Sequence, residues 1–429
     1  MAKPSLEGLP AELLIVILSQ ISELDDLKSI VLSSPVCHRA YVMVRQDVLH
    51  NILRRGYGEF LDLSEAITAI RSKGLLLEHH EEEAIGLLDR WRRREEIRQY
   101  SPTLAARLYQ PGDLEETINV LQLLKKLQFF YEDYTINLPR PPWIDPAQWK
   151  REVPLKMSDN EKCRFMRALC RLQMYANILG PPEMSGQWRE REGQVLFDNY
   201  VTDEKHYRLF LGVLPPWEVH EMGCVWSYLM SKYNPVFEKI SDGLREAMKN
   251  EPSRFFWDVL PDDECPPPAI IDTVADLRLL PTYTEVLASL GPDFLYRVLH
   301  TTSIPQRNMV IANLNTAYLS PLDGWFPTWE DRMPLTDPAD RHCVRNFEQF
   351  WSTLPPIDQP NLGWRKLGLV PHSPEQELED ALNTYSDQNL EKEWPWGYAL
   401  WDDVRLKKWE APLLRDGRGD APLLLLPAP

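Results

Sequence analysis

Glycine is scarce in this chain. Only 19 of the 429 residues are glycine, and none of them forms GxGxxG, GxxxxGK[ST] or GxSxG. These patterns build the phosphate-binding loops and nucleophile turns of many nucleotide-binding proteins and hydrolases, so their absence removes the commonest sequence evidence for catalysis. The six cysteines are scattered and include no CxxC pair, which is the usage expected of reduced, mostly buried thiols.

Basic charge is also in short supply. The chain holds 47 Lys and Arg against 64 Asp and Glu, a formal net charge of −17. Surfaces that bind nucleic acid or anionic membranes need an excess of basic residues, so we expect the chain to bind neither. The N-terminal Met-Ala-Lys-Pro-Ser-Leu-Glu-Gly contains no apolar stretch of the kind that a secretory signal needs, and no run of the chain approaches the roughly 18 apolar residues of a membrane span. We therefore expect no secretory signal, and a cytoplasmic or nuclear location.

The patterns that are present indicate a folded, mainly α-helical protein. Hydrophobic residues make up 44% of the chain, apolar residues recur at spacings of three and four, and strand-like alternation is weak. In the N-terminal part we predict helices over 9–21, from residue 25 or 26, over 35–56, 78–100 and 113–131. In the C-terminal part they are expected after Ser158 and near 185–200, 217–232, 236–249, 293–300, 305–318, 340–352, 374–384 and 399–409.

Proline and tryptophan mark a change of composition near residue 138. The first 138 residues hold 5 of the 37 prolines and 1 of the 15 tryptophans. The sequence after Leu138 is stiff, because each proline disfavours helix for the residue before it. It indicates either a domain boundary or a long loop that crosses one domain. We predict a three-helix motif over 1–55, a helical extension over 56–138, an irregular, proline- and tryptophan-rich multi-helix domain over 139–412, and a disordered tail over 413–429.

Metal or catalytic chemistry has little support in the remaining motifs. His220 and Cys224 lie one helical turn apart, but zinc needs three or four ligands, so we interpret Cys224 as a core residue and His220 as a surface residue. His79, His80 and the three glutamates after them point to different sides of a helix and are typical of a solvated face. His342-Cys343 has no orienting group nearby. We expect no catalytic residue, metal or cofactor.

Two further clusters have ordinary structural explanations. The basic run Arg90-Trp-Arg-Arg-Arg94 is flanked by glutamates on both sides, which favours ion pairs along a helix over phosphate contacts. The tryptophans of segment 394–409 could anchor an interface. Core packing is the favoured interpretation, because large rings are usually buried.

The helix expected over residues 9–21 carries too much apolar surface for one side. Pro10 suits its first turn, and six apolar residues cover more than half of its circumference, whereas a helix packed only on its own domain needs a stripe about 100° wide. The six are Leu13, Leu14, Ile15, Ile17, Leu18 and Ile21. A partner protein or the rest of this chain must bury the surplus.

The first three predicted helices together resemble the F-box. Leu9-Pro-x-Glu-Leu-Leu-x-x-Ile-Leu18 is similar to the opening of that motif, Asp26-Leu27 followed by Val31 to its middle, and Ser34-Pro-Val-Cys-His-Arg39 to its close. The match covers about residues 6–50. The whole layout, including the late Gly-Tyr-Ala-Leu-Trp-Asp-Asp segment, is similar to fungal F-box-like proteins.

This resemblance implies a non-enzymatic substrate adaptor of an SCF (cullin–RING) ubiquitin ligase. The motif would dock on a Skp-type linker protein, and the rest of the chain would recruit a protein target of unknown identity. The mode would be a helix in a groove, with apolar anchors at i, i+3 and i+4 spacing. Carried over to this sequence, the docking residues are Leu9, Pro10, Leu13, Leu14, Ile17 and Leu18, with Pro35 and Val36 in addition.

A helical scaffold with a vestigial motif is the alternative. In that case the surplus apolar face would pack on later helices of the same chain. Solvent exposure of Leu14 and Leu18 would favour the adaptor, whereas their burial would favour the scaffold.

Overall fold

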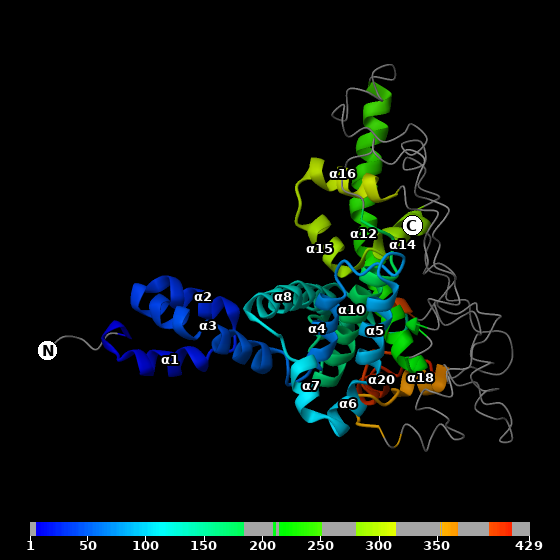
Figure 1. The fold of residues 1–429 in the computed structure, drawn as a ribbon. Helices are drawn as coiled ribbons and strands as arrows, with labels where there is room; N and C mark the ends of the chain where they lie inside the picture. Colours follow the sequence, from blue (N-terminus) through cyan, green and yellow to red (C-terminus); the bar gives the residue numbers. More distant parts are fainter. Residues whose placement is uncertain are drawn as a thin grey trace. The chain divides into compact units, whose positions relative to one another are not determined.

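A computed structural model describes residues 6–183, 209–211, 214–250, 280–314, 352, 354–367 and 394–413. The described elements are helices, with no strand among them (Figure 1), which confirms the mainly α-helical fold class. Two compact units divide the chain. Unit 1 comprises Met1–Arg71 and Asp89–Lys126, and unit 2 comprises Ser72–Leu88 and Leu127–Pro429. None of the helices in the described ranges is long and apolar enough to cross a membrane.

Unit 1 begins with the three helices that the sequence predicted. Its elements are η1 (Leu6–Gly8), α1 (Ala11–Ser19), α2 (Leu24–Ser33), α3 (Pro35–Gly56), α4 (Leu63–Arg71), α6 (Arg94–Tyr100) and α7 (Pro102–Leu108). Ser34 caps α3 by accepting a hydrogen bond from the Val36 N–H, and Pro35 occupies the first turn, where a missing N–H costs nothing. Both α1 and α2 pack on α3, so these three helices form one motif.

Two helices are shared between the units. The end of α5 (Glu81–Arg92) and the first half of α8 (Leu114–Asn137) belong to unit 1. Because α8 runs without a break to Asn137, the proline-rich segment after Leu138 marks the end of a helix. The unit boundaries fall instead at residues 71, 88 and 126, whereas the composition indicated a boundary near 138.

Unit 2 is built around α10 (Asp159–Ile178), which is buried along most of its length. This helix begins after Ser158, as the sequence predicted, and a Ser158–Glu161 capping box opens it. Its other elements are α9 (Pro146–Glu152), α12 (Pro216–Asn250), α14 (Leu280–Ala288), α15 (Gly291–Leu299), α16 (Ser303–Leu314), α18 (Leu362–Leu367) and α20 (Asp403–Lys408). Segment 72–88 joins this unit through the Leu77 N–H, which donates to the Ile178 carbonyl at 2.8 Å.

One expected helix break is wrong. We predicted separate helices over 217–232 and 236–249, but α12 runs through Pro235 as one helix. Proline weakens a helix interior by removing one hydrogen bond. Here α12 packs on both α10 and α14, and that tertiary packing offsets the local cost. The helices expected near 185–200, 340–352 and 374–384, His342-Cys343 and the 413–429 tail lie outside the described residues, except for residues 352 and 413.

Candidate protein-docking surface

Helix α1 presents one buried and one exposed apolar face. Leu14 and Leu18 are 2% and 1% exposed, and they lie on the side that packs on α3. Leu27 of α2 and Cys37 and Ala40 of α3 are buried as well. These five side chains form the core of the three-helix motif, so their first role is to hold the motif together.

The other side of α1 is accessible. Leu13 is 50% and Val16 55% exposed. Pro10 is exposed, and Leu9 and Ile17 are half-buried. Residues 10, 13 and 17 follow helical spacing, so these side chains share one face of the helix.

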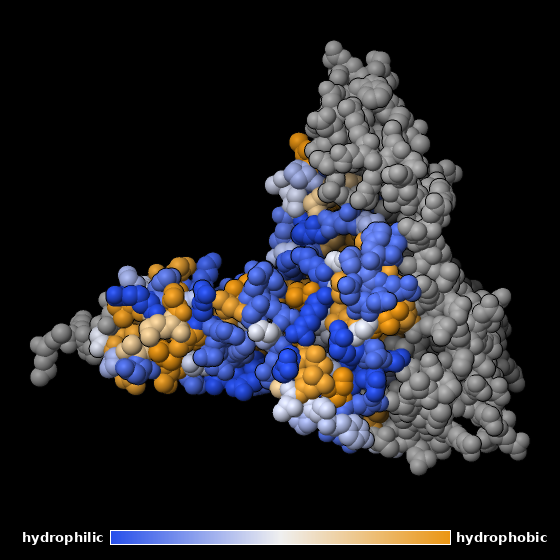
Figure 2. Space-filling view, in the orientation of Figure 1, coloured by the Kyte–Doolittle hydropathy of each residue, from blue (hydrophilic) through white to orange (hydrophobic). Residues whose placement is uncertain are grey.

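Exposed apolar side chains continue onto the other two helices of the motif. Leu32 at the end of α2 is 71% exposed, and Val42 and Met43 of α3 are 48% and 74% exposed. Together with Leu13 and Val16 they define the apolar surface of the motif. In Figure 2, hydrophobic residues are visible both over α1 and over α2 and α3.

Exposed apolar residues are concentrated in this motif. Single exposed apolar residues are normal on protein surfaces, whereas gathered ones mark interaction sites. Of the thirteen exposed large apolar residues in the described part of the chain, six lie between Leu6 and Met43, although that stretch is a small part of the whole. The three-helix motif is therefore the strongest candidate for a protein-docking surface.

The structure corrects two of the eight predicted docking residues. Leu14 and Leu18 are buried against α3 and do not lie on an exposed face. Of the other six, Pro10, Leu13 and Pro35 are exposed and Leu9, Ile17 and Val36 are half-buried. The sequence-based set omitted Val16, Leu32, Val42 and Met43. For Val16 a signal was present, because it lies three residues after Leu13 on the same face.

Polar contacts tie the motif to the rest of unit 1. The Lys125 ammonium group lies 2.9 Å from the Asp25 carboxylate, and its hydrogen bond and charge hold the pKa of Asp25 below its usual value. Within the motif itself, Arg55 of α3 donates to Gln20 at 3.0 Å, whereas the His50 ring contacts the rest of unit 1 and lies 2.9 Å from the Thr117 hydroxyl. The first two contacts are exposed, so each contributes little to stability.

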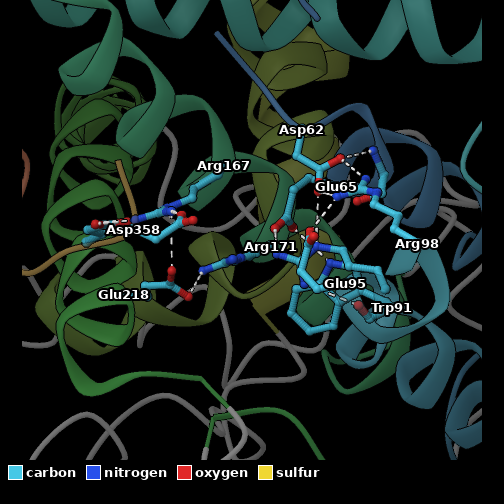
Figure 3. A network of polar contacts seen from close by, with 12 residues as sticks. Asp62, Glu65, Trp91, Glu95, Arg98, Arg167, Arg171, Glu218 and Asp358 are labelled. Carbon is cyan, nitrogen blue, oxygen red and sulfur yellow. Dashed lines mark hydrogen bonds and ion pairs between the residues drawn. The ribbon is translucent and has the colours of Figure 1, made fainter. Parts of the chain in front are cut away.

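Arg92, Arg93 and Arg94 of the basic run are paired within unit 1. Arg92 and Arg93 contact Asp89, three and four residues earlier, which confirms ion pairs along the helix. The sequence did not reveal a longer-range cluster in which Arg94 and Arg98 bind Asp62 at 3.0 and 2.5 Å (Figure 3). In the same cluster, the Trp91 indole N–H donates to Glu65 at 3.1 Å. Because these guanidinium groups are bound by carboxylates, ion pairing explains the basic cluster without phosphate contacts.

Unit 2 contains a buried ion network between α10 and α12. Arg167 makes two hydrogen bonds to Glu221, at 2.7 and 2.8 Å, and Arg171 makes one to Glu218 at 2.7 Å. Asp358 accepts a further one from Arg167 at 2.8 Å (Figure 3). Buried charges need such pairing to offset lost hydration. Because each of these arginines is paired with a carboxylate, the network needs no ligand to account for its charges and serves as a contact between α10 and α12.

His220 is buried, and its prediction as a surface residue is wrong. The Trp394 indole N–H donates to Nδ1 of His220 at 3.2 Å, and the Tyr398 hydroxyl lies 2.6 Å from the same atom. Burial lowers the pKa of His220 to about 3. Cys224 faces the core as predicted, at 1% exposure.

Two other interpretations are confirmed, namely the solvated face at residues 79–80 and the core packing of the late tryptophans. His79 and His80 are exposed, and the tryptophans at 394, 396, 401 and 409 are buried, which supports core packing over an exposed interface. Within the described ranges, no group of three or more His, Cys, Asp or Glu residues could hold a metal ion.

Comparison with protein-family models gives no match to this chain, and the searches of curated proteins and of solved structures give none either.

Proposed function

We propose that this protein is a non-enzymatic adaptor that docks on a Skp-type linker protein of an SCF ubiquitin ligase through the apolar surface of its three-helix motif. Unit 2 would recruit the protein target. One observation carries the proposal. The F-box-like helices α1–α3 have their own core, centred on Leu14 and Leu18, and still expose Leu13, Val16, Leu32, Val42 and Met43.

The physical argument rests on what covers α1. If later helices buried its surplus apolar face, Leu13 and Val16 would be covered, but both are half exposed or more. An apolar surface of this kind gains free energy when a partner removes it from water, at about 25 cal/mol per Å². A groove lined by apolar side chains on the linker is the complementary surface.

A helical scaffold with a vestigial motif is the second candidate. Burial of Leu14 and Leu18 favours it, because exposure of these two residues was the outcome expected of the adaptor. The helix that buries Leu14 and Leu18 is α3 of the same motif. Their burial therefore removes these two residues from the proposed docking set, but it leaves the other face of α1 available to a partner. The two candidates differ in one measurable property, which is direct binding of the linker.

Binding of the purified full chain to a purified Skp-type linker tests the proposal by calorimetry. Leu13→Asp and Val16→Asp place a charge on the exposed face and are expected to weaken binding by about tenfold or more each. Their melting temperatures should stay close to that of the wild-type chain. Leu104→Asp is the matched control, because Leu104 is 43% exposed in the same unit but lies on α7.

Three results would count against the proposal. If the wild-type chain does not bind the linker, the adaptor function is wrong and the scaffold is favoured. If Leu13→Asp and Val16→Asp bind as tightly as wild type, the assigned surface is wrong. If Leu104→Asp weakens binding as strongly as they do, the effect is not specific to the motif.

A further inference from the structure

Residues 394–413, here called the C-terminal segment, have little regular structure of their own. The segment contains a 3₁₀ turn and one six-residue helix, α20, which is far too short to be stable alone. Yet its four tryptophans are 5% exposed or less. The segment is therefore ordered by the surface on which it lies, in the manner of a bound peptide.

Side chains of that surface hydrogen bond to the backbone of the C-terminal segment. Trp143 donates to the Trp409 carbonyl at 3.1 Å, Arg164 to the Leu400 carbonyl at 3.3 Å, and Asn361 to the Tyr398 and Trp401 carbonyls at 2.6 and 2.8 Å. In the reverse direction, the Asp402 N–H donates to Glu161 at 3.0 Å. Peptide-recognition sites bind extended chains in this way, with main-chain hydrogen bonds giving affinity and side-chain pockets giving specificity.

Aromatic and charged contacts add selectivity for particular residues of the segment. The Trp409 ring packs edge-on against Trp149 of α9, with ring centroids 5.6 Å apart. Arg405 makes two hydrogen bonds to Glu161, each 2.7 Å long, and its guanidinium group lies 5.4 Å from the centre of the Trp409 ring. Glu161 is 1% exposed, so this carboxylate is a buried anchor for a basic residue.

We propose that the surface formed by Trp143, α9, the start of α10, His220 of α12 and Asn361 is a peptide-binding site, and that the C-terminal segment fills it as a detachable ligand in cis. The ligand class is a peptide with closely spaced aromatic residues, followed by an acidic residue and then an arginine. Residues 394–409 display this pattern as Trp-Pro-Trp-Gly-Tyr-Ala-Leu-Trp-Asp-Asp-Val-Arg-Leu-Lys-Lys-Trp. The contacts all lie within unit 2, so the proposal does not depend on linker docking.

The test uses the full chain and a fluorescent synthetic peptide of residues 394–413. In a Trp401→Ala/Trp409→Ala chain, the segment in cis loses two anchors while the receiving surface stays intact. We expect the peptide to bind this variant at least about tenfold more tightly than it binds the wild-type chain, as measured by fluorescence anisotropy. A peptide carrying the same two alanines should not bind.

The matched control adds Glu161→Gln to the doubly substituted chain. Glutamine retains the capping role at the start of α10 but removes the charge that binds Arg405, so the peptide should bind about tenfold more weakly. If the doubly substituted chain unfolds, recovery of its helical circular dichroism on addition of the peptide supports the proposal.

Three outcomes would overturn it. The first is equal peptide binding by the wild-type and doubly substituted chains. The second is a folded double variant that does not bind the peptide. The third is an unfolded variant that the peptide does not restore, which would make the segment an inseparable part of the core.

Discussion

The hydroxyl of Tyr398 and Nδ1 of His220 lie 2.6 Å apart in the interior of unit 2, although 178 residues separate them in the sequence. The Trp394 indole donates to the same nitrogen, and an indole N–H can only donate. Nδ1 is therefore an acceptor, and His220 is the neutral tautomer with its proton on Nε2. A second proton, placed on Nδ1, would point at the Trp394 indole N–H and would put a charge in the core.

This arrangement predicts how the stability of unit 2 depends on pH. Burial lowers the pKa of His220 from 6.5 to about 3, so the unfolded chain binds the proton first as the pH falls. The contribution of neutral His220 to the free energy of unfolding is fully present above pH 6.5. It is lost progressively between pH 6.5 and about 3, by up to about 1.4 kcal/mol per pH unit. Chemical denaturation at a series of pH values measures it.

His220→Gln is the variant that isolates this effect. Its amide oxygen can accept from Trp394 and Tyr398, and it does not titrate. We expect the variant to be less stable than wild type at pH 7.5 and to show a shallower loss of stability from pH 6.5 to 4.5. Parallel pH profiles for the two chains would contradict the assignment of that slope to His220.

The sequence predicted local structure better than it predicted which side chains are buried. Pro10, the Ser34 cap and the Ser158–Glu161 box are local signals, and each lies at the start of a helix in the structure. Leu13 and Leu14 are adjacent leucines with the same propensity, and only the position of α3 makes one exposed and the other buried. Leu32 and Met43 were not identified because a surface made by three helices depends on how they pack.

Long-range pairing explains the other wrong or missing predictions. His220 lies near Trp394 and Tyr398, whose contact with it cannot be read from any local pattern. Arg164, Arg167 and Arg171 follow helical spacing on α10, and a stripe of charge normally indicates a solvated face. Arg167 and Arg171 are buried because Glu218 and Glu221 lie three residues apart on the helix α12 that packs on α10. Arg164 pairs with Asp402 at 2.8 Å.

The buried ion network predicts a large cost for removing one partner. Arg167→Met would leave Glu221 without its two hydrogen bonds at 2% exposure. We expect a loss of about 3–5 kcal/mol in the free energy of unfolding at pH 7. Glu221→Gln combined with Arg167→Met removes both charges and should recover part of that loss. If the double variant is as unstable as the sum of the single ones, the two residues are not coupled.

The Asp62 cluster predicts an acid-sensitive unit 1. Burial by itself raises the pKa of Asp62, but the hydrogen bond from Arg98 and the charges of Arg94 and Arg98 outweigh it and hold the pKa well below its usual range. Ionised Asp62 therefore stabilises the folded state above about pH 3.8, the pKa of this carboxyl in the unfolded chain. That stabilisation is lost as the pH falls below this value. Asp62→Asn should lower stability at pH 7 by about 1–3 kcal/mol and flatten this acid dependence. Fluorine NMR of 5-fluorotryptophan at Trp91 reports on unit 1, and an unchanged transition in the variant would contradict the prediction.

Tyr134 and Gly397 give the most specific prediction, because the Tyr134 hydroxyl lies against the position that a side chain at residue 397 would occupy. Among the described residues, the buried Tyr134 hydroxyl has no hydrogen-bond partner. Gly397 adopts a φ of 75°, which residues with a side chain rarely adopt, and a Cβ atom there would collide with that hydroxyl.

Tyr134→Phe should therefore be neutral or slightly stabilising, since it removes an unpaired buried polar group. Gly397→Ala should cost about 1–3 kcal/mol from backbone strain, with the collision in addition. In the double variant the collision is absent while the strain remains, so its loss of stability should be smaller than that of Gly397→Ala alone. Thermal unfolding of the four chains measures this coupling, and strictly additive effects would show that the hydroxyl and the glycine are not in contact.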